Sequence, residues 1–213
     1  MKQDDIINVA VIVAHPDDET LWAGGTILGH PEWNVIVLSL CRGFDTNRAP
    51  RFAEVMKKIG AMGIMGDLDD GPTQEPLESE KVEEVIVDLL PVRHYDLIIT
   101  HHPRGEYTRH LRHEETGKAV IKLWSNVSIS TRILWCFAYE DGGREYYPKA
   151  VEVGTLICPL DKAVWERKYK LITETYGFDK NSWEAHTTPT TESFLQFTNP
   201  KDVTQWLGSL SQS

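Results

Sequence analysis

The stretch IINVAVIVAHPDDE, residues 6–19, is the part of the sequence that says most about the fold. Its first nine residues form a continuous apolar run rich in β-branched side chains, the pattern of a strand buried on both faces of a sheet. The acidic turn after this run leads into a predicted helix at 19–29, with Asp17 or Asp18 placed to cap its start. A buried strand that passes directly into a helix predicts an α/β domain.

Strand-like and helix-like segments alternate along the rest of the chain. The predicted strands lack the alternation of polar and apolar residues that is typical of an antiparallel sheet with one wet face, so we predict a mostly parallel sheet. We expect residues 1–213 to form a single domain, with an irregular C-terminal extension from about 177 that contains a short helix near 202–210. The other predicted strands are 34–40, 95–100, 133–139 and 154–160, and the other predicted helices are 51–62, 80–90, 113–124 and 161–176.

Composition and charge narrow the classes of function. With 41% hydrophobic and 25% charged residues, the chain can bury a core, which excludes global disorder. Its formal net charge of −10 argues against nucleic-acid binding, and no apolar run approaches the ~18 residues of a membrane span. The 3 cysteines are widely spaced and form no CxxC zinc motif. We therefore expect a cytoplasmic protein without nucleic-acid or membrane partners.

Two histidine-rich segments follow predicted strands. His15 and His101 each come directly after a strand, and the carboxyl ends of parallel strands share one edge of the sheet, where ligands bind. His15 and Asp18 are three residues apart across a turn, and His110 and His113 are three apart on one predicted helical face. Imidazole nitrogens together with one carboxylate oxygen are the ligand set expected for a catalytic zinc, so we predict a metal site at this edge.

The motif AHPDDE at 14–19, followed by a distant His-x-x-His at 110–113, resembles the PIG-L/LmbE family of zinc-dependent N-deacetylases. Arg51-x-x-Glu54 and the sequence GEY at 105–107 are similar to the family as well, and the resemblance covers about residues 7–125. It implies a Rossmann-like, three-layer α/β domain with a mostly parallel sheet, in agreement with the pattern of strands and helices.

The resemblance also implies roles for individual residues. It implies that one Zn²⁺ per chain is held by His15, Asp18 and His113. Asp17 then serves as the general base for the attacking water, and adjacent side chains diverge, which leaves Asp17 beside the metal rather than on it. The resemblance assigns to His110 the polarisation or protonation of the reacting amide.

Three further residues are expected to contact the substrate. Arg51 matches a family position that does so, and Tyr107 is placed to help hold the oxyanion. His186 lies in the C-terminal extension, from which it could fold over the site as a second proton donor. Trp183 is the best candidate among the tryptophans for a wall of the substrate site.

The second motif departs from the family. The family commonly has GEYGHPDH, whereas this chain has GEYTRHLRH, which is one residue longer ahead of the first histidine. The Asp that often precedes the last histidine is Arg112 here, so another carboxylate must orient His110 or the role of His110 is altered. The acidic run DLDD at 67–70 is interpreted only as a polar loop.

The function that the resemblance implies is hydrolysis of an N-acyl bond on an amino sugar or sugar conjugate, which releases a free amine and usually acetate. We expect a deacetylase that acts on an N-acetylglucosaminyl small molecule. Two alternatives stay open: an amidase acting on a different N-acylated natural product, and a catalytically inactive sugar-binding protein on the same fold. The sugar acceptor, the length of the acyl group and homo-oligomer formation also stay open.

Overall fold

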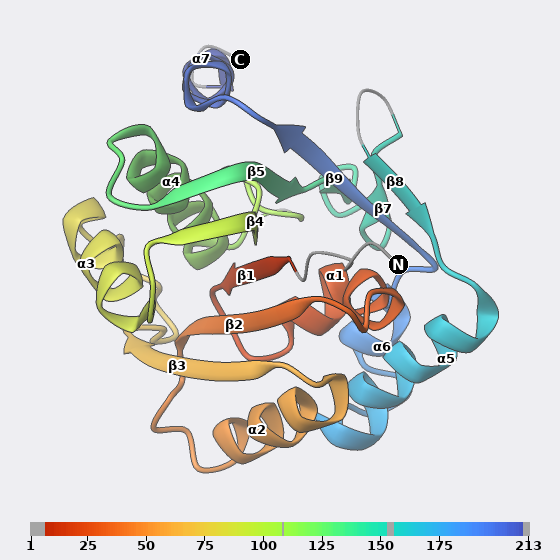
Figure 1. Ribbon diagram of the computed structural model, residues 1–213. Helices are drawn as coiled ribbons and strands as arrows, with labels where there is room; N and C mark the ends of the chain where they lie inside the picture. Colours follow the sequence, from red (N-terminus) through yellow and green to blue (C-terminus); the bar gives the residue numbers. More distant parts are fainter. Residues whose placement is uncertain (1–6, 108, 153–155, 211–213) are drawn as a thin grey trace, which may run out of the picture.

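A seven-stranded sheet runs through the part of the chain that the structure describes, residues 7–107, 109–152 and 156–210 (Figure 1). In this computed structural model the strands are β1 (Asn8–Val13), β2 (Asn34–Cys41), β3 (Met62–Leu68), β4 (His94–Thr100), β5 (Ser130–Phe137), β6 (Tyr139–Glu140), β7 (Lys149–Ala150), β8 (Leu156–Pro159) and β9 (Thr191–Phe197). The order in the sheet is β3-β2-β1-β4-β5-β9-β8, and β6 and β7 form a separate two-stranded sheet.

The strand order creates a switch point beside β1. Strands β1 to β5 are parallel, while β9 runs antiparallel to both β5 and β8. The chain first builds outward from β1 through β2 to β3 and then returns to the other side of β1 for β4. The loops after β1 and β4 therefore diverge, and the crevice between them is where ligands bind in such sheets.

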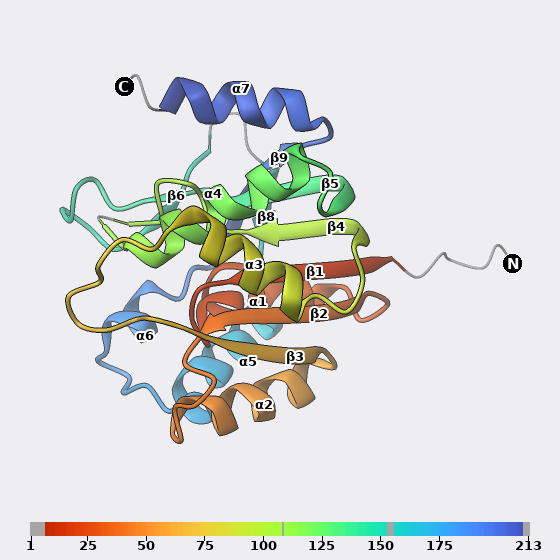
Figure 2. The ribbon, with the colours of Figure 1, turned by 90° about the vertical axis from the view of Figure 1, so that its left-hand side faces the viewer.

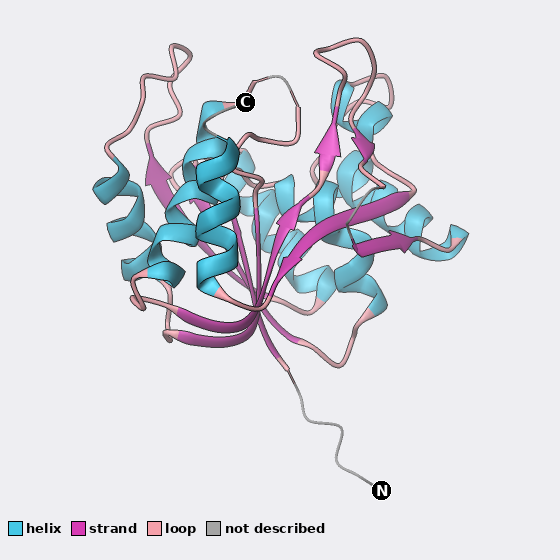
Figure 3. Cartoon of the chain, turned by 90° about the horizontal axis from the view of Figure 1, so that it is seen from above, coloured by secondary structure: helices cyan, strands magenta, loops and turns pink. Residues whose placement is uncertain are grey.

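Helices cover both faces of the sheet (Figure 3). Along β1, Ile12 belongs to a core cluster shared with helices α3 (Ser79–Leu89), α4 (Leu111–Ser125) and α7 (Pro200–Leu210). Val11 belongs to the cluster on the other face, shared with α1 (Asp18–Gly29), α2 (Arg48–Ile59) and the π-helix η1 (Leu171–Thr175). Burial on both faces explains why the strand is a continuous apolar run, and it confirms the predicted three-layer fold. The remaining helices are α5 (Lys162–Lys170) and α6 (Trp183–Thr187).

The C-terminal part differs from the sequence expectation. Residues 191–197 were expected to be irregular, and they instead form β9 between β5 and β8. Glu192 interrupts the apolar pattern expected of a buried strand. In the structure its buried carboxylate forms an ion pair with the equally buried Lys168 at 2.7 Å. It also accepts hydrogen bonds from the N–H groups of Gly25 and Thr26, which ties β9 to α1.

Strand β3 was also missed. Its sequence MGIMGDL contains two glycines and few β-branched residues, and as an edge strand it pairs only with β2. The predicted helix at 51–62 begins earlier in the structure, at Arg48, and ends at Ile59. No helix among the described residues is long and apolar enough to cross a membrane.

Candidate active site

The predicted ligand residues meet at the switch point. His15 follows β1, Asp18 is the first residue of α1, and His113 lies in the first turn of α4. The Nδ1 atom of His15 lies 3.1 Å from Asp18 Oδ2 and 3.2 Å from His113 Nε2, and the latter two atoms are 3.3 Å apart. Zinc bonds of ~2.0–2.1 Å in a tetrahedron require ligand atoms about 3.3 Å apart. These three atoms therefore fit a zinc ion.

In both histidines, a carboxylate contacts the ring nitrogen that points away from the three ligand atoms. The Nε2 atom of His15 lies 3.2 Å from Asp70 Oδ1, and Nδ1 of His113 lies 2.6 Å from Glu106 Oε2. A carboxylate on the outer nitrogen fixes the tautomer that leaves the inner nitrogen free to bind a metal, the usual arrangement around metal-binding histidines. The donor set and its outer partners thus suit a bound metal.

Carboxylates and imidazoles in this buried cluster shift one another's pKa values, and Glu106 and Asp18 raise the pKa of His101 to about 9 although burial alone would lower it. Although burial alone would raise their pKa values, neighbouring histidines hold the pKa of Glu106 and that of Asp18 below the ordinary range. His15 and Arg42 do the same for the pKa of Asp70. Arg42 pairs with Asp70 at 2.5 Å. Asp18 and Glu106 contact imidazoles and also accept hydrogen bonds from Trp22 Nε1 and from the backbone N–H groups of His15 and His102. A divalent cation would interact favourably with the carboxylates of this cluster.

His101 lies beside the cluster and is fully buried. Its Nε2 atom accepts a hydrogen bond from the Ala14 N–H at 3.0 Å and lies 3.4 Å from Asp18 Oδ2. Its Nδ1 atom is 2.9 Å from the same Glu106 oxygen that contacts His113. One carboxylate therefore holds two histidine rings that stack with centroids 4.0 Å apart.

Asp17 occupies the N-cap position of α1, but its side chain makes no capping hydrogen bond. The carboxylate instead lines the site cavity and lies 3.6 Å from Arg48 Nη1. Burial and the adjacent charge of Asp18 raise the pKa of Asp17 well above its ordinary value, against the opposing effect of Arg48. A carboxylate with a raised pKa beside the ligand atoms is suited to act as a base near neutral pH.

His110 is held by an amide rather than by a carboxylate. Gln74 Nε2 lies 3.3 Å from His110 Nε2, and an amide N–H that donates there leaves the ring proton on Nδ1. That Nδ1 atom is buried and has no hydrogen-bond partner among the described residues. Burial and the charges of His113 and His15 lower the pKa of His110 to about 3, so the ring is neutral at neutral pH.

Arg112, which stands where the family often has Asp, secures the loop that carries Asp70 and Gln74. Its side chain is 1% exposed and donates to the backbone carbonyls of Asp69 and Glu75, at 2.5 and 2.8 Å. It also pairs with Glu115 at 2.5 Å. The loop between β3 and α3 thereby reaches the site, where it supplies the partners of His15 and His110.

The three predicted substrate contacts have different positions. Tyr107 lines the site cavity, which has a volume of about 430 Å³. Arg51 does not line it, because its guanidinium donates to the backbone carbonyl of Tyr176; Arg48, one turn earlier on α2, takes that place. His186 lines a neighbouring cavity, while Trp183 lines both cavities.

Several site residues were missed at the sequence level. Asp70 and Gln74 follow β3, and without that strand nothing placed the polar loop at the sheet edge. Glu106 lies within the GEY motif, yet the sequence alone assigned it no role. Arg48 could have been found from its spacing, three residues before Arg51 on the same predicted helix.

Fold and cluster together define a doubly wound α/β protein with a histidine–carboxylate centre at the switch point of its sheet. Over residues 10–124, more than half of its length, the chain matches the PIG-L family, described as GlcNAc-PI de-N-acetylase, and it belongs to that family. It is thus homologous to deacetylases.

Individual relatives are distant. An uncharacterized protein, L374, of Acanthamoeba polyphaga mimivirus is 22% identical over 176 residues, which span 76% of this chain and 75% of that protein. The N,N'-diacetylchitobiose deacetylase of Pyrococcus horikoshii, bound to its inhibitor MPG, superposes with a TM-score of 0.67 at 17% identity, over 91% of this chain and 85% of that one. The zinc-inhibited form of teicoplanin deacetylase Orf2 gives a TM-score of 0.62 at 13% identity, over 89% and 97%. At these identities the structural likeness bears on the fold alone.

Proposed function

We propose that this protein is a zinc-dependent hydrolase that removes an N-acetyl group from an amino sugar or sugar conjugate. The observation that carries the proposal is the triangle of His15 Nδ1, Asp18 Oδ2 and His113 Nε2, with sides of 3.1–3.3 Å. It lies in a cavity that also presents Asp17. Family membership and the deacetylases of the same fold support amide hydrolysis as the reaction.

The same three atoms would hold one Zn²⁺ per chain. Bound zinc supplies a Lewis acid that polarises the amide carbonyl and acidifies a neighbouring water. The protein supplies the rigid arrangement, because Asp70 and Glu106 keep the two imidazoles in the required tautomers.

Asp17 takes the proton of the attacking water. Its carboxylate is free of the helix it precedes, and the raised pKa matches the affinity for a proton that a base needs near neutrality. Arg48 Nη1 lies 3.6 Å away and stabilises the ionised carboxylate, which is the form that accepts a proton.

His110 and Tyr107 face the developing charges on the substrate. The ring of His110 lines the site cavity and is neutral, so it can act on the amide oxygen or the departing nitrogen as a neutral imidazole rather than as an imidazolium. Burial, followed by the charges of Asp18 and Glu106, raises the pKa of Tyr107, so its hydroxyl stays a hydrogen-bond donor.

A combined metal and activity measurement tests the proposal. We expect purified protein to contain about one zinc per chain and to release acetate from N-acetylglucosamine glycosides, with less activity on longer N-acyl groups. His113→Ala should lose both the zinc and the activity. Preference for another acyl group would establish the amidase alternative, and a zinc-loaded protein that binds these sugars without hydrolysis would contradict the proposed reaction.

A further inference from the structure

The region between β8 and β9 folds back against the helices that carry the start of the site. It contains α5, η1 and α6, and in Figure 2 it lies on the same face of the sheet as α2, opposite α4 and α7. Ile172 and Tyr176 of this region belong to the same core cluster as Leu21 of α1 and Phe52 of α2. A region far along the chain therefore packs against the two helices that present Asp17 and its neighbours.

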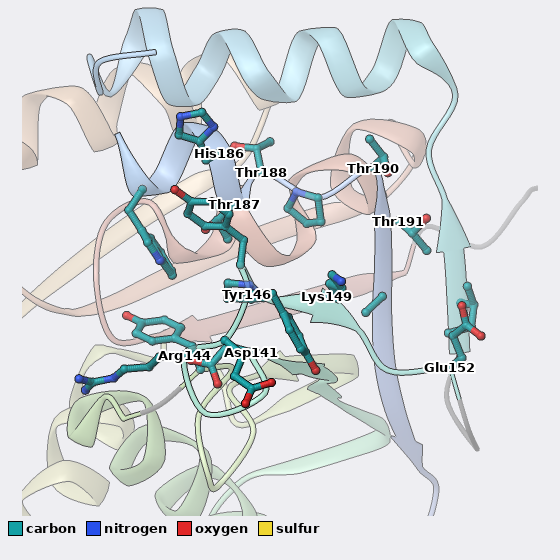
Figure 4. A pocket seen from close by; sticks show the side chains of 18 residues that line it. Asp141, Arg144, Tyr146, Lys149, Glu152, His186, Thr187, Thr188, Thr190 and Thr191 are labelled. Carbon is teal, nitrogen blue, oxygen red and sulfur yellow. The ribbon is translucent and has the colours of Figure 1, made fainter. Parts of the chain in front are cut away.

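One end of this region forms a wall of a second cavity beside the site. This larger cavity has a volume of about 1100 Å³, and Figure 4 shows its labelled side chains coming from residues 141–152 and 186–191. Trp183, at the start of α6, lines both cavities, whereas Asp17 lines the site cavity and not the larger one. The part of the region that bears on Asp17 is a different one, the 176–178 segment that follows η1.

The side chain of Tyr176 reaches the start of α1. Its hydroxyl donates a hydrogen bond to Oε1 of the fully buried Glu19 at 2.7 Å, and Oε2 of Glu19 accepts one from the Asp17 N–H at 3.1 Å. A buried carboxylate needs such donors, because burial removes the water that would otherwise solvate it. Tyr176 therefore helps to keep Glu19 in the position from which it holds the backbone of Asp17.

The backbone of the 176–178 segment holds Arg51 of α2. The Arg51 guanidinium donates to the Tyr176 carbonyl, and a Cβ atom on Gly177 would overlap the same guanidinium. The φ of Gly177 is 76°, in the left-handed region that favours glycine. The segment and the first turn of α2 thus pack closely, and the glycine permits this contact.

Phe178 connects the segment to a second residue of α2. The guanidinium carbon of Arg48 lies 4.6 Å from the centroid of the Phe178 ring, a cation–π distance, and Nη1 of Arg48 lies 3.6 Å from Asp17 Oδ2. Asp17 is thus held at two points, at its N–H by Glu19 and at its carboxylate by Arg48. Both of these residues contact the 176–178 segment.

We propose that the 176–178 segment positions Asp17. Tyr176 and Phe178 are then positioning residues, which act through the groups that they contact. The backbone of Asp17, with φ of 126°, needs this support because such a conformation persists only where its surroundings fix it. The inference rests on the proposed function for the role of Asp17 as the base. Tyr176 and Phe178 line neither cavity, so changing them should affect the rate rather than the binding of substrate.

Crystal structures of the wild type and of two variants test the positioning directly. Tyr176→Phe keeps the ring in the core and removes only the hydroxyl, so Glu19 should leave the Asp17 N–H and the φ of Asp17 should become negative. Phe178→Leu keeps an apolar side chain and removes the ring, so Arg48 should move away from the Asp17 carboxylate. This comparison does not depend on whether acetate is released. Asp17 in its wild-type position in both variants would overturn the proposal.

Kinetics add a readout that a purely structural role would not change. On N-acetylglucosamine glycosides, Tyr176→Phe should lower kcat about 10–10²-fold, the effect of a small misplacement of a reacting group, with KM and zinc content close to wild type. In an Asp17→Asn background the same change should have no further effect on kcat, because the group that it misplaces is already lost. Tyr169→Phe is the matched control, because Tyr169 on α5 stacks on Trp165 and lines neither cavity.

The outcomes separate this positioning role from the proposed reaction. An equal loss of kcat in both backgrounds, or a wild-type kcat in Tyr176→Phe, would overturn the positioning role. Absence of acetate release from the wild-type protein would contradict the proposed function instead, and the crystal structures would then decide the positioning of Asp17 on their own.

Discussion

Asp17 holds a backbone conformation that residues with a side chain rarely adopt, with φ of 126°. Such a conformation costs ~1–3 kcal/mol and persists only where its surroundings fix it. Here Glu19 Oε2 accepts a hydrogen bond from the Asp17 N–H at 3.1 Å, and the Tyr176 hydroxyl donates to Glu19 Oε1 at 2.7 Å. We infer that this strain turns the carboxylate of Asp17 away from α1 and toward the cavity.

The Asp17→Asn variant tests the role of the carboxylate. An amide of the same shape cannot accept the proton of the attacking water, so kcat/KM should fall about 10²–10⁴-fold while zinc content and substrate affinity stay close to wild type. The acidic limb of the pH–rate profile should flatten, because the base loses activity as it protonates at low pH. Asn caps a helix as well as Asp does, so a near-wild-type rate would show that Asp17 is only a cap.

His110 and His113 are expected to behave differently although they are neighbours on one helix face. His110→Ala should keep zinc and lower kcat about 10²–10⁴-fold, the usual effect of removing a group that assists proton transfer. Metal analysis of the two alanine variants side by side checks this. Loss of zinc in His110→Ala would mean that the extra residue in GEYTRHLRH has changed which histidine binds the metal.

At the scale of elements, one glycine sets how closely α4 approaches the end of β4. A Cβ atom on Gly117 would lie 2.5 Å from the backbone oxygen of His101. Without a side chain here, the loop after β4 packs directly on α4, and this close approach brings His101 and Glu106 against His113. Backbone contact rather than helix propensity explains why a glycine sits inside this helix.

Gly117→Ala should therefore destabilise the protein by ~1–3 kcal/mol, the cost of overpacking, although alanine favours a helix by ~1 kcal/mol. Gly208→Ala in α7 is the matched control, because a Cβ there meets nothing within 4 Å, and it should stabilise slightly. Urea unfolding of both variants measures the difference. A gain in stability at both positions would show that α4 can shift without cost.

The sequence predicted the strands that are apolar runs and missed β3 and β9, whose sequences are interrupted by glycines or by polar residues. Strands β1, β2 and β4 are apolar on both faces and stand out as runs, whereas β3 is an edge strand with two glycines. Strand β9 hides the carboxylate of Glu192 in an ion pair that only the tertiary structure reveals. The pattern of apolar residues along the sequence indicates the average burial of a segment. It does not predict a strand in which a buried polar residue is paired with a residue far away in the sequence.

The candidate site was also predicted only in part. Ligand residues at strand ends were expected together, and the structure brings His15, Asp18 and His113 within 3.3 Å of one another. Asp70, which contacts His15, and Gln74, which contacts His110, lie on the loop after the missed strand β3, so their proximity to the site could not be predicted. The resemblance points to Arg51, whereas in the structure Arg48 lines the cavity and the guanidinium of Arg51 donates to the backbone carbonyl of Tyr176, so the contact of Arg51 with substrate stays a prediction.

For the whole molecule, the proposed metal site predicts that metal binding stabilises the fold. A metal that binds only the folded state stabilises it by mass action, by about 4 kcal/mol at a free concentration 1,000 times Kd. Removal of zinc with a chelator should lower Tm by roughly 5–15 °C in a chain of this size. Differential scanning calorimetry with and without chelator checks this, and His113→Ala should be insensitive to the chelator. An unchanged Tm in the wild type would contradict a metal held by these residues.

We expect the two cavities to rest on parts of the fold that open to solvent at different rates. The proposed metal ligands follow β1, which has strands on both sides, or lie on α4, which packs into the core. The wall of the larger cavity rests on β6 and β7, a ribbon of two residues per strand. Local unfolding begins where few backbone hydrogen bonds and little apolar packing hold a segment, so amide hydrogens of the ribbon should exchange long before those of β1. Evolution can therefore rebuild the ribbon, and with it the wall of this cavity, without disturbing the proposed metal ligands.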